Sequence, residues 1–268
     1  MLNPLRLQKY LQTQSFGRDL LQLAVVDSTN RILSDWLQPA RWPGDPLRVG
    51  TTLIATQQKA GRGQYGRVWH SPPGGLYLSL VLEPQQPLSE LTGLTLALVW
   101  GVVAQLRHHL SQDIGIKWPN DLVAHGKKLG GLLLQTRTQQ QQLQSMVVGL
   151  GLNIRAYPEA GDPSPLLPLS ESTNLQDVVG MPLTSEPIAA WVLLGLEQGF
   201  SSWQQSRLHK ILPECEAWLL HRYATINLGK QGMATVLGVA PSGALRVQTQ
   251  TGEICLMPGE IRLQDVLV

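Results

Sequence analysis

The apolar and polar positions along the chain form blocks that predict a mixture of strands and helices. Short apolar runs between turn residues indicate strands, and longer runs with helical spacing indicate helices. Residues 76–82 are apolar except for Ser79, so this strand is expected to be buried on both faces. Residues 27–30 offer N-cap chemistry for a helix that ends at Leu37. The expected strands are 21–26, 51–56, 76–82 and 114–117, and the other expected helices are 5–11, 88–110, 186–209 and 213–221.

Two hairpins are expected in the middle of the chain. The first turns at His125-Gly126, and the second turns at the glutamine run 139–142. Four prolines between residues 155 and 174 predict an irregular surface loop. The hairpin strands are expected at 122–124, from 129 onward, at 131–136 and at 143–150.

The C-terminal segment has a different pattern. From residue 224 to residue 263, short β-type runs are separated by glycines and by the turn Pro241-Ser242-Gly243. This spacing is typical of a small antiparallel barrel of about five strands. We therefore expect two domains, residues 1–222 and residues 223–268.

Composition supports a folded chain and narrows its class. Hydrophobic residues make up 43% of the 268 residues and charged residues 15%, so a sizeable core is expected. The net charge of +2 is too small for the dense basic stripe of a nucleic-acid binder. No signal pattern opens the chain, and the apolar run 94–106 is too short to span a membrane. We expect a cytoplasmic protein without membrane contact.

Metal-binding and thiol chemistry find little support in the sequence. The two cysteines, Cys215 and Cys255, form no Cys-x-x-Cys pair and are expected to be reduced structural thiols. The histidines are scattered without zinc spacing, so no metal ligands are predicted among the side chains.

A loop rich in glycine and arginine is the first candidate for chemistry. Residues 61–67 read Gly-Arg-Gly-Gln-Tyr-Gly-Arg, which combines a tightly folding backbone with fixed positive charge and so suits an anionic ligand. The Gly-x-Gly-x-x-Gly spacing matches a dinucleotide fingerprint, but that motif must open a helix. Here residues 72–75 are Pro-Pro-Gly-Gly, so an irregular loop is expected, with Tyr65 and Trp69 as aromatic walls. A surface hairpin with solvated arginines is the alternative.

Further charged residues follow at the ends of expected strands. Lys117 comes directly off a strand, and Pro119 ends the strand pairing after it. A lysine at a strand end is held rigidly, so its charge could stabilise a reacting phosphate. Asp121 is placed to accept a hydrogen bond from an amine, and an ion pair between Lys117 and Asp121 is the alternative. Lys128 precedes two glycines, Gly130 and Gly131, that allow close approach of a ligand or of a neighbouring strand.

The end of the strand after the second hairpin carries an amide. Asn153 could hydrogen-bond a phosphate or a metal-bound water, and a simple turn-forming role is the alternative. Together with the glycine loop and the two lysine segments, this residue suggests one site that handles phosphate.

Five segments occur in a fixed order, and this order is more informative than any one of them. The segments are Asp27-Ser28-Thr29-Asn30, Gln58-x-x-Gly61-Arg62-Gly63-x-x-Gly66-Arg67-x-Trp69, Lys117-Trp118-Pro119-Asn120-Asp121, Lys128-Leu129-Gly130-Gly131 and Gly149-x-Gly151-x-Asn153. Their order resembles that of the biotin protein ligase (biotin–[acetyl-CoA-carboxylase] ligase) family over about residues 20–265. The resemblance implies an α+β fold with a class II synthetase-like, mixed and largely antiparallel sheet, packed helices and a small C-terminal SH3-like β-barrel.

The resemblance also implies a two-step reaction and roles for individual residues. Biotin and MgATP would give biotinyl-5′-AMP, and a lysine of a biotin carboxyl carrier domain would then receive the biotin. The catalytic residues by match are Arg62, Lys117 and Asp121. The binding residues by match are Ser28, Thr29, Asn30, Gln58, Arg62, Gly63, Gln64, Arg67, Trp69, Lys128, Gly130 and Asn153, with biotin, ATP and Mg²⁺ as the implied small molecules.

Two departures from the family pattern carry expectations of their own. Some members have an added N-terminal winged helix, but here the pattern begins at about residue 21, so operator binding is not expected. Gln64 stands where some members have arginine, which bears on retention of the adenylate and on target selectivity.

Three other functions and one assembly stay open. Lipoate or octanoate transfer uses related chemistry, but the glycine loop and the Trp-Pro-Asn-Asp turn favour biotin. A non-catalytic biotin sensor is disfavoured by the joint presence of Arg62, Lys117 and Asp121, and a transcription regulator by the missing domain. A homodimer through an exposed sheet edge is possible.

Overall fold

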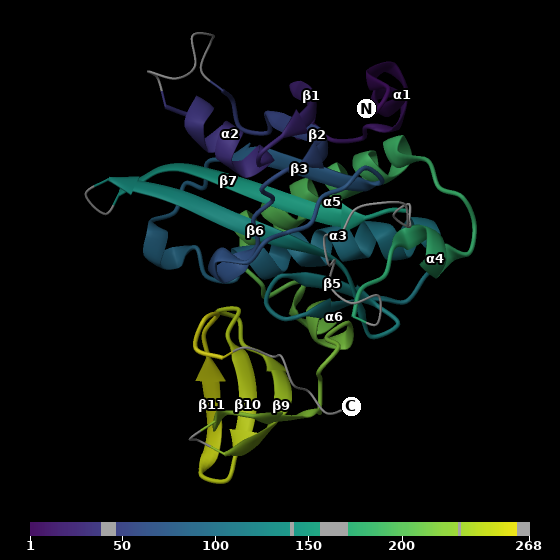
Figure 1. Cartoon of the computed structure of the whole chain (residues 1–268). Coiled ribbons are helices and arrows are strands. Elements are labelled where there is room, and N and C mark those ends of the chain that lie inside the picture. The colour runs from purple at the N-terminus through teal and green to yellow at the C-terminus, as the bar shows by residue number, and fades with distance from the viewer. Residues whose placement is uncertain (39–46, 140–141, 156–170, 230–231, 262–268) are drawn as a thin grey trace.

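The computed structural model describes residues 1–38, 47–139, 142–155, 171–229 and 232–261, in a larger mixed sheet with helices and a smaller C-terminal sheet (Figure 1). The larger sheet has seven strands in the order β1-β2-β3-β7-β6-β5-β4, and only β1 and β2 pair in parallel. These strands are β1 (Leu20–Val26), β2 (Thr52–Gln58), β3 (Gly75–Leu82), β4 (Ile114–Lys117), β5 (Asp121–Ala124), β6 (Lys127–Gln139) and β7 (Gln142–Asn153). The predicted mixed, largely antiparallel sheet is confirmed.

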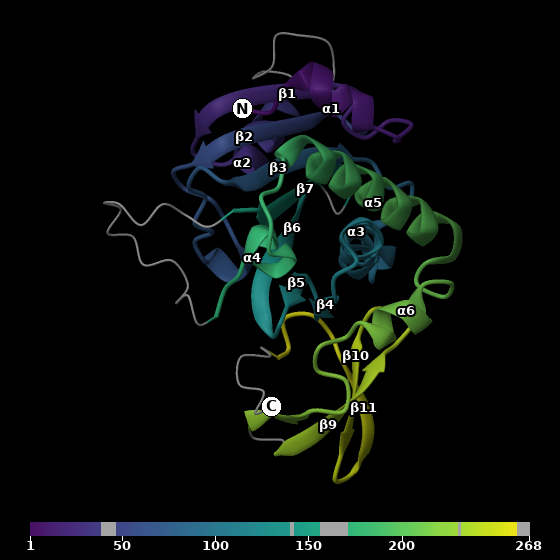
Figure 2. The ribbon, with the colours of Figure 1, turned by 90° about the vertical axis from the view of Figure 1, so that its right-hand side faces the viewer.

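Helices cover the two faces of this sheet unequally. α3 (Leu94–Leu110) and α5 (Ser185–Ser206) pack on one face, while α2 (Thr29–Trp36) lies on the other (Figure 2). The even-numbered leucines of β3 join the main core with α3 and α5, and Val81 joins a small second core with Leu33 of α2. β3 is buried on both faces, as its apolar sequence predicts.

Close backbone contact holds α3 against α5. Gly101 of α3 faces Gly195 of α5, and a Cβ atom on either would collide with the backbone of the other helix. α3 is the apolar helix whose run ends at Leu106, and its side chains are largely buried in the core. No helix in the described part of the chain has the length and apolarity needed to cross a membrane.

Three helix boundaries differ from the sequence prediction, and one of them is the end of α5, which lies at Ser206 where residue 209 was expected. The expected helix 88–110 is a 3₁₀ turn, η2 (Leu88–Glu90), followed by α3, because Gly93 adopts a left-handed conformation with φ of 76° at the start of α3. The expected helix 213–221 is the shorter α6 (Leu212–Ala217). It ends early because the next residues pair with β4: Ile116 N donates to Trp218 O at 2.7 Å, and Leu220 N donates to Ile116 O at 2.8 Å.

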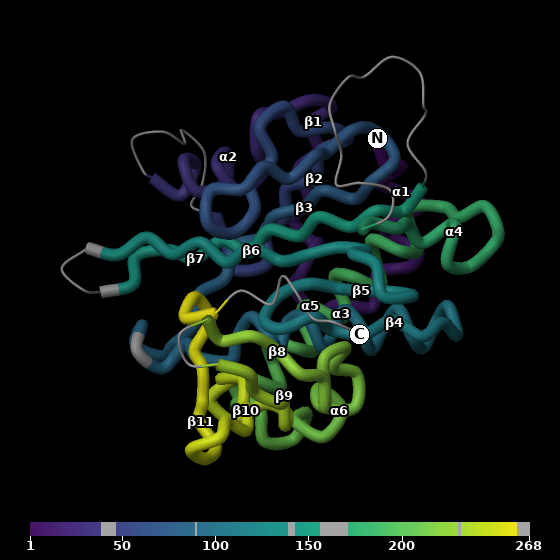
Figure 3. The backbone as a smooth tube through the Cα atoms, turned by 60° about the horizontal axis from the view of Figure 1, so that its bottom comes forward, coloured from purple at the N-terminus to yellow at the C-terminus, as the bar shows by residue number. Residues whose placement is uncertain are grey.

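The remaining elements follow the predicted order. α1 (Pro4–Tyr10) and the first hairpin form as expected, with His125 and Gly126 at its turn in positive-φ conformations. The strands of the second hairpin pair as expected, and residues 140–141 of its predicted turn lie outside the described residues. The long β6–β7 hairpin extends beyond the rest of the sheet (Figure 3). α4 (Leu175–Val179) follows the proline-rich segment, of which residues 156–170 lie outside the described residues.

The C-terminal sheet contains four antiparallel strands in the described residues, where about five were expected. They are β8 (Thr225–Asn227), β9 (Met233–Val239), β10 (Leu245–Thr249) and β11 (Gly252–Leu256). Trp118 connects the two sheets, because its Nε1 donates to Gly243 O at 2.8 Å. Both cysteines are free, with Cys215 buried and Cys255 exposed.

Candidate active site

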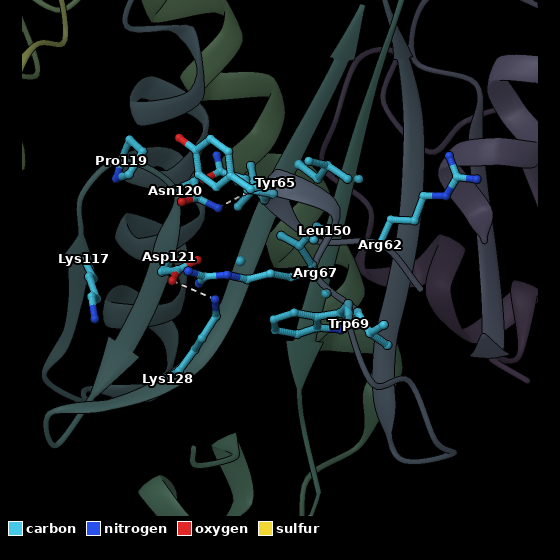
Figure 4. A pocket seen from close by; sticks show the side chains of 18 of the residues that line it. Arg62, Tyr65, Arg67, Trp69, Lys117, Pro119, Asn120, Asp121, Lys128 and Leu150 are labelled. Carbon is cyan, nitrogen blue, oxygen red and sulfur yellow. Dashed lines mark hydrogen bonds and ion pairs between the residues drawn. The ribbon is translucent and has the colours of Figure 1, made fainter. Parts of the chain in front are cut away.

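One cavity of about 670 Å³ brings together the glycine loop, the start of α2 and the ends of β4, β5 and β6 (Figure 4). Arg62, Lys117 and Lys128 all line it, although they are up to 66 positions apart in the sequence. Most of the predicted site residues are in its wall: Ser28, Thr29, Asn30, Gln58, Arg62, Gly63, Gln64, Arg67, Trp69, Lys117, Asp121 and Lys128.

The glycine loop is a compact irregular loop between β2 and β3, as predicted. It contains a single 3₁₀ turn, η1 (Gln64–Gly66), in which Tyr65 has φ of 56°. Backbone hydrogen bonds close the loop on itself: Gly63 N donates to Arg67 O at 2.8 Å, and Trp69 N donates to Gly61 O at 2.9 Å. The loop opens no α-helix, which removes the dinucleotide-binding interpretation of the three glycines.

Two glycines of β7 form part of the cavity floor. They are Gly149 and Gly151, whose side-chain positions point to the same face of the sheet because they are two residues apart. A Cβ atom on Gly149 would collide with the amide of Asn30, and one on Gly151 would collide with the indole of Trp69. The two glycines of β7 therefore leave the space in which the side chains of Asn30 and Trp69 lie.

A chain of hydrogen bonds fixes the polar groups at the start of α2. Thr29 donates from its backbone N and its Oγ1 to Gln58 Oε1, at 2.9 and 3.1 Å. Gln58 Nε2 then donates to Ser71 Oγ at 2.8 Å. The side chain of Ser28, which is the N-cap residue, makes no capping hydrogen bond, so its hydroxyl is not tied to the helix. This end of the cavity offers several oriented hydroxyl and amide groups to a polar ring.

An ion pair lies near the centre of the cavity. Lys128 Nζ is 2.7 Å from Asp121 Oδ2, and the two side chains are 27% and 17% exposed. The same ammonium lies 5.3 Å from the centroid of the Trp69 ring, a cation–π distance. The alternative ion pair of Asp121 with Lys117 is wrong, because the Asp121 carboxylate pairs with Lys128 although Lys117 is its backbone neighbour across β4 and β5. A register shift between β5 and β6 sets Lys128 opposite Val123, two residues from Asp121 on the same strand.

Asp121 keeps one oxygen available. Its Oδ1 is buried and has no hydrogen-bond partner among the described residues. Gly131, which also lines the cavity, makes this arrangement possible, because a Cβ atom there would lie 2.8 Å from Asp121 Oδ1. A buried carboxylate oxygen without a partner is costly, so a donor from a ligand or a water is expected to bind it.

Lys117 and Arg62 lie on opposite sides of this central group (Figure 4). Lys117 is at the end of β4, and the nearby His221 is 4% exposed. Burial, together with the charge of Lys117, lowers the pKa of His221 to about 4, so the imidazole is neutral at pH 7 and adds no second positive charge. The guanidinium of Arg62 points away from Asp121 and Lys128, while that of Arg67 points toward them (Figure 4).

Two predicted site residues are not in the cavity wall. The side chain of Asn153 donates to Thr173 O at 2.9 Å and is 7% exposed. Gly130 faces the neighbouring strand, since a Cβ atom there would lie 2.8 Å from Gly151 O. Of the two alternatives that the sequence left open for Gly130, close approach of a strand is the one observed.

Sequence reasoning missed several residues that complete the cavity. Gly149 and Gly151 were noted only as part of a motif, although their spacing already places both on one face of a strand. Glu171 and Ile261 have no such signal, because Glu171 follows the proline-rich residues and Ile261 follows the last strand of the C-terminal sheet. Asn120 was likewise noted only as part of a motif, and the lining residues Leu132, Leu133 and Leu150 were not singled out.

The arrangement suits the joining of two anionic molecules. Four cationic side chains, Arg62, Arg67, Lys117 and Lys128, share one cavity wall with Asp121. Such charges can lower the barrier for a carboxylate that attacks a phosphate, because they stabilise the negative charge that the two reactants bring together. The polar start of α2 lies in the same cavity and can bind an uncharged ring.

Comparison with known protein families gives a match over residues 23–153, to the biotin/lipoate A/B protein ligase family. The chain is 31% identical over 254 residues to the biotin–[acetyl-CoA-carboxylase] ligase of Paracoccus denitrificans, which covers 89% of this chain and 98% of the relative. It is 30% identical over 265 residues to the bifunctional ligase/repressor BirA of Escherichia coli, covering 96% of this chain and 78% of that one.

A solved structure agrees with these sequence relatives. The biotin protein ligase from Aquifex aeolicus in complex with biotin and ATP superimposes with a TM-score of 0.75 at 25% identity, over 91% of this chain and 97% of the other.

Proposed function

The chain belongs to the biotin/lipoate A/B protein ligase family, and on that premise we propose that it is an ATP-dependent biotin protein ligase. It activates biotin as biotinyl-5′-AMP and transfers the biotin to a lysine of the carrier domain of acetyl-CoA carboxylase. The observation that carries the proposal is the meeting of Arg62, Lys117, Lys128 and Asp121 in one cavity that also holds the polar start of α2.

Biotin is assigned to the end of the cavity nearest α2. Thr29 and Gln58 present hydroxyl and amide groups that suit the ureido ring, and the Ser28 hydroxyl, which makes no capping bond, can add another. Leu132 and Leu150 supply apolar wall for the rest of the molecule. The biotin carboxylate then extends toward the ammonium of Lys128, which lines the centre of the cavity.

The first step joins the two substrates. An oxygen of the biotin carboxylate attacks the α-phosphorus of ATP, the bond from that phosphorus to the bridging oxygen breaks, and pyrophosphate leaves. Lys117 stabilises the charge on the phosphate, and Arg62 adds a second cation once the glycine loop closes over the ligands. Closure also keeps water from the reactive mixed anhydride.

The second step uses the carboxylate in the centre. The ε-amine of the carrier lysine attacks the acyl carbon, the bond to the phosphate oxygen breaks, and AMP leaves. Asp121 orients the amine and accepts its proton through Oδ1, the oxygen that has no partner. Lys128 holds Asp121 through Oδ2 in the free protein and turns to the biotin carboxylate or the adenylate once ligand is bound.

Mg²⁺ is assigned a supporting role with ATP. The described residues contain no group of three or more His, Cys, Asp and Glu side chains that could hold a metal alone. Mg²⁺ commonly binds substrate phosphates and waters with one or two carboxylates, and Glu171 is a lining carboxylate that could supply one. The ion would neutralise part of the phosphate charge.

Gln64, Arg67 and Trp69 are assigned to the adenylate. All three line the cavity, and Trp69 Nε1 is buried without a hydrogen-bond partner in the described part of the chain. We keep Gly130 as a residue that shapes the strand, and Asn153 as one that could act on ATP only after leaving Thr173. A homodimer through an edge strand stays a prediction.

The proposal is tested by isotope exchange between ATP and pyrophosphate with the purified protein. We expect exchange that depends on biotin, followed by transfer to a carrier domain that is detected as a mass increase. Exchange that depends on lipoate or octanoate but not on biotin would indicate a lipoate or octanoate ligase instead. Biotin binding without exchange would indicate the non-catalytic sensor.

A further inference from the structure

One hydroxyl lies in the middle of the buried strand β3 and has no place in the roles given above. Ser79 is 0% exposed and does not belong to the cavity wall. Its cross-strand neighbours are Leu53 on β2 and Gly149 on β7, so it lies on the face of the sheet that α2 covers. An apolar residue would serve packing better at this position, since a buried hydroxyl must find hydrogen-bond partners.

Ser79 finds its partners in two predicted biotin-binding residues. Its Oγ lies 2.7 Å from Thr29 Oγ1 and also within hydrogen-bond distance of Asn30 Oδ1. Gly149 makes the second contact possible, because it leaves room for the Asn30 amide above the strand. Both partners line the cavity, so Ser79 lies directly behind its wall.

The number of available protons fixes which groups in this network donate. Asn30 Nδ2 donates to Leu133 O at 3.3 Å, so Asn30 Oδ1 faces Ser79 and can only accept. The backbone N–H of Thr29 donates to Gln58 Oε1, so that oxygen also accepts. The hydroxyls of Thr29 and Ser79 bring one proton each, and three contacts inside the network compete for these two protons.

The consequence concerns the side of Thr29 that faces the cavity. Both hydroxyl protons are used between side chains of the network, and neither is left to point at a ligand. Thr29 therefore presents a lone pair of its Oγ1 to the ligand and acts as a hydrogen-bond acceptor. Acceptors at this place suit the ring N–H groups of a cyclic urea and disfavour a ligand that presents a lone pair there.

We propose that Ser79 is a positioning residue that sets the hydrogen-bond polarity of the biotin pocket. It acts through Thr29 and Asn30 and does not touch the ligand. The inference rests on the proposed function, because it takes the ureido ring as the group that Thr29 binds. Without the Ser79 hydroxyl, Asn30 Oδ1 loses its donor and Thr29 Oγ1 loses a contact of 2.7 Å. Thr29 then keeps only Gln58 Oε1 as its side-chain partner, so both side chains are held less firmly in the orientation that suits the ligand.

The test compares Ser79→Ala with the wild type and with a matched control. Thr52→Val is the control, because Thr52 is also 0% exposed, and its hydroxyl donates to Gly50 O at 2.9 Å outside the site. Ser79→Thr keeps the hydroxyl and serves as the rescue. Biotin affinity is measured by titration calorimetry, and the KM for ATP and kcat are measured by pyrophosphate exchange.

We expect Ser79→Ala to weaken biotin binding about ten-fold, with kcat and the KM for ATP within about two-fold of the wild type. Thr52→Val should lose similar thermal stability and keep wild-type biotin affinity, and Ser79→Thr should recover most of the affinity. Unchanged biotin affinity in Ser79→Ala, or equal weakening in Thr52→Val, overturns the inference. Absence of biotin-dependent exchange in the wild type would instead overturn the proposed function.

Discussion

The ion pair between Lys128 and Asp121 gives the most specific prediction about the order of events. In the free protein the Asp121 carboxylate forms an ion pair with the Lys128 ammonium, to which the biotin carboxylate is also expected to bind. Biotin therefore binds in competition with Asp121, and Asp121→Asn removes the competing charge while it keeps the shape of the side chain.

The geometry sets the size of the effect. A hydrogen bond of 2.7 Å between two charged groups that are 27% and 17% exposed contributes about 1.5–3 kcal/mol. The amide of Asn retains part of this contact, so we expect biotin to bind up to about ten-fold more tightly, since 1.4 kcal/mol corresponds to a factor of ten. Loss of the group that receives the amine proton should slow transfer by about 100-fold or more.

The two steps can be measured separately. Adenylate formation is followed by pyrophosphate release in a single turnover, and transfer is followed by mixing preformed adenylate with a carrier domain and recording its mass. Asp121→Asn should change the first rate by only a few-fold. Asp113→Asn is the control, because Asp113 pairs with Arg107 on the surface and is 91% exposed. Equal loss of both steps in Asp121→Asn would refute the division of roles, and so would weaker biotin binding.

Three further outcomes are expected from other parts of the molecule. Lys117→Ala should slow adenylate formation by about 10²–10³-fold in the single-turnover assay with biotin affinity unchanged, and equal loss of biotin affinity would argue against a role at the phosphate. Burial by itself raises the pKa of Glu197, but hydrogen bonds from the backbone N–H groups of residues 14–16 outweigh it and lower the pKa below its usual value. The stability that Glu197 adds is therefore present above the pKa of the unfolded chain and is lost as the pH falls through the lower, folded pKa. The difference in urea stability between wild type and Glu197→Gln should shrink on acidification. A difference that grows would contradict this reasoning. Gly195→Ala should destabilise the protein by about 1–3 kcal/mol in urea unfolding, because the added Cβ would force α5 away from Gly101. A gain in stability from the higher helix propensity of alanine would show that the helices can separate freely.

The strands of the large sheet were predictable because they differ sharply from their surroundings. Runs such as 76–82 are apolar and end at turn residues, so period and length identify them. Helix ends were harder to predict. Gly93 delays the start of α3 through a left-handed conformation, and the pairing of Trp218 with Ile116 ends α6 early. The second effect depends on a strand that is distant in the sequence.

The site was predictable as a set of residues but not as a geometry. The order of the motifs identified most of the lining, because each motif lies where a strand or loop must end. The partner of Asp121 could not be read from the chain, since it depends on a register shift between β5 and β6. Ser79 carried a usable signal, as a lone hydroxyl in a buried apolar strand, but its partners on α2 appear only once the helix is placed over the sheet.

A crystal structure of the protein with biotin and ATP tests the central claim most directly. We expect biotinyl-5′-AMP in the cavity, with its ureido ring against Thr29 and Gln58 and its acyl phosphate within hydrogen-bond distance of Lys117 or Lys128. An adenylate bound elsewhere, or one in this cavity that neither lysine contacts, would contradict it.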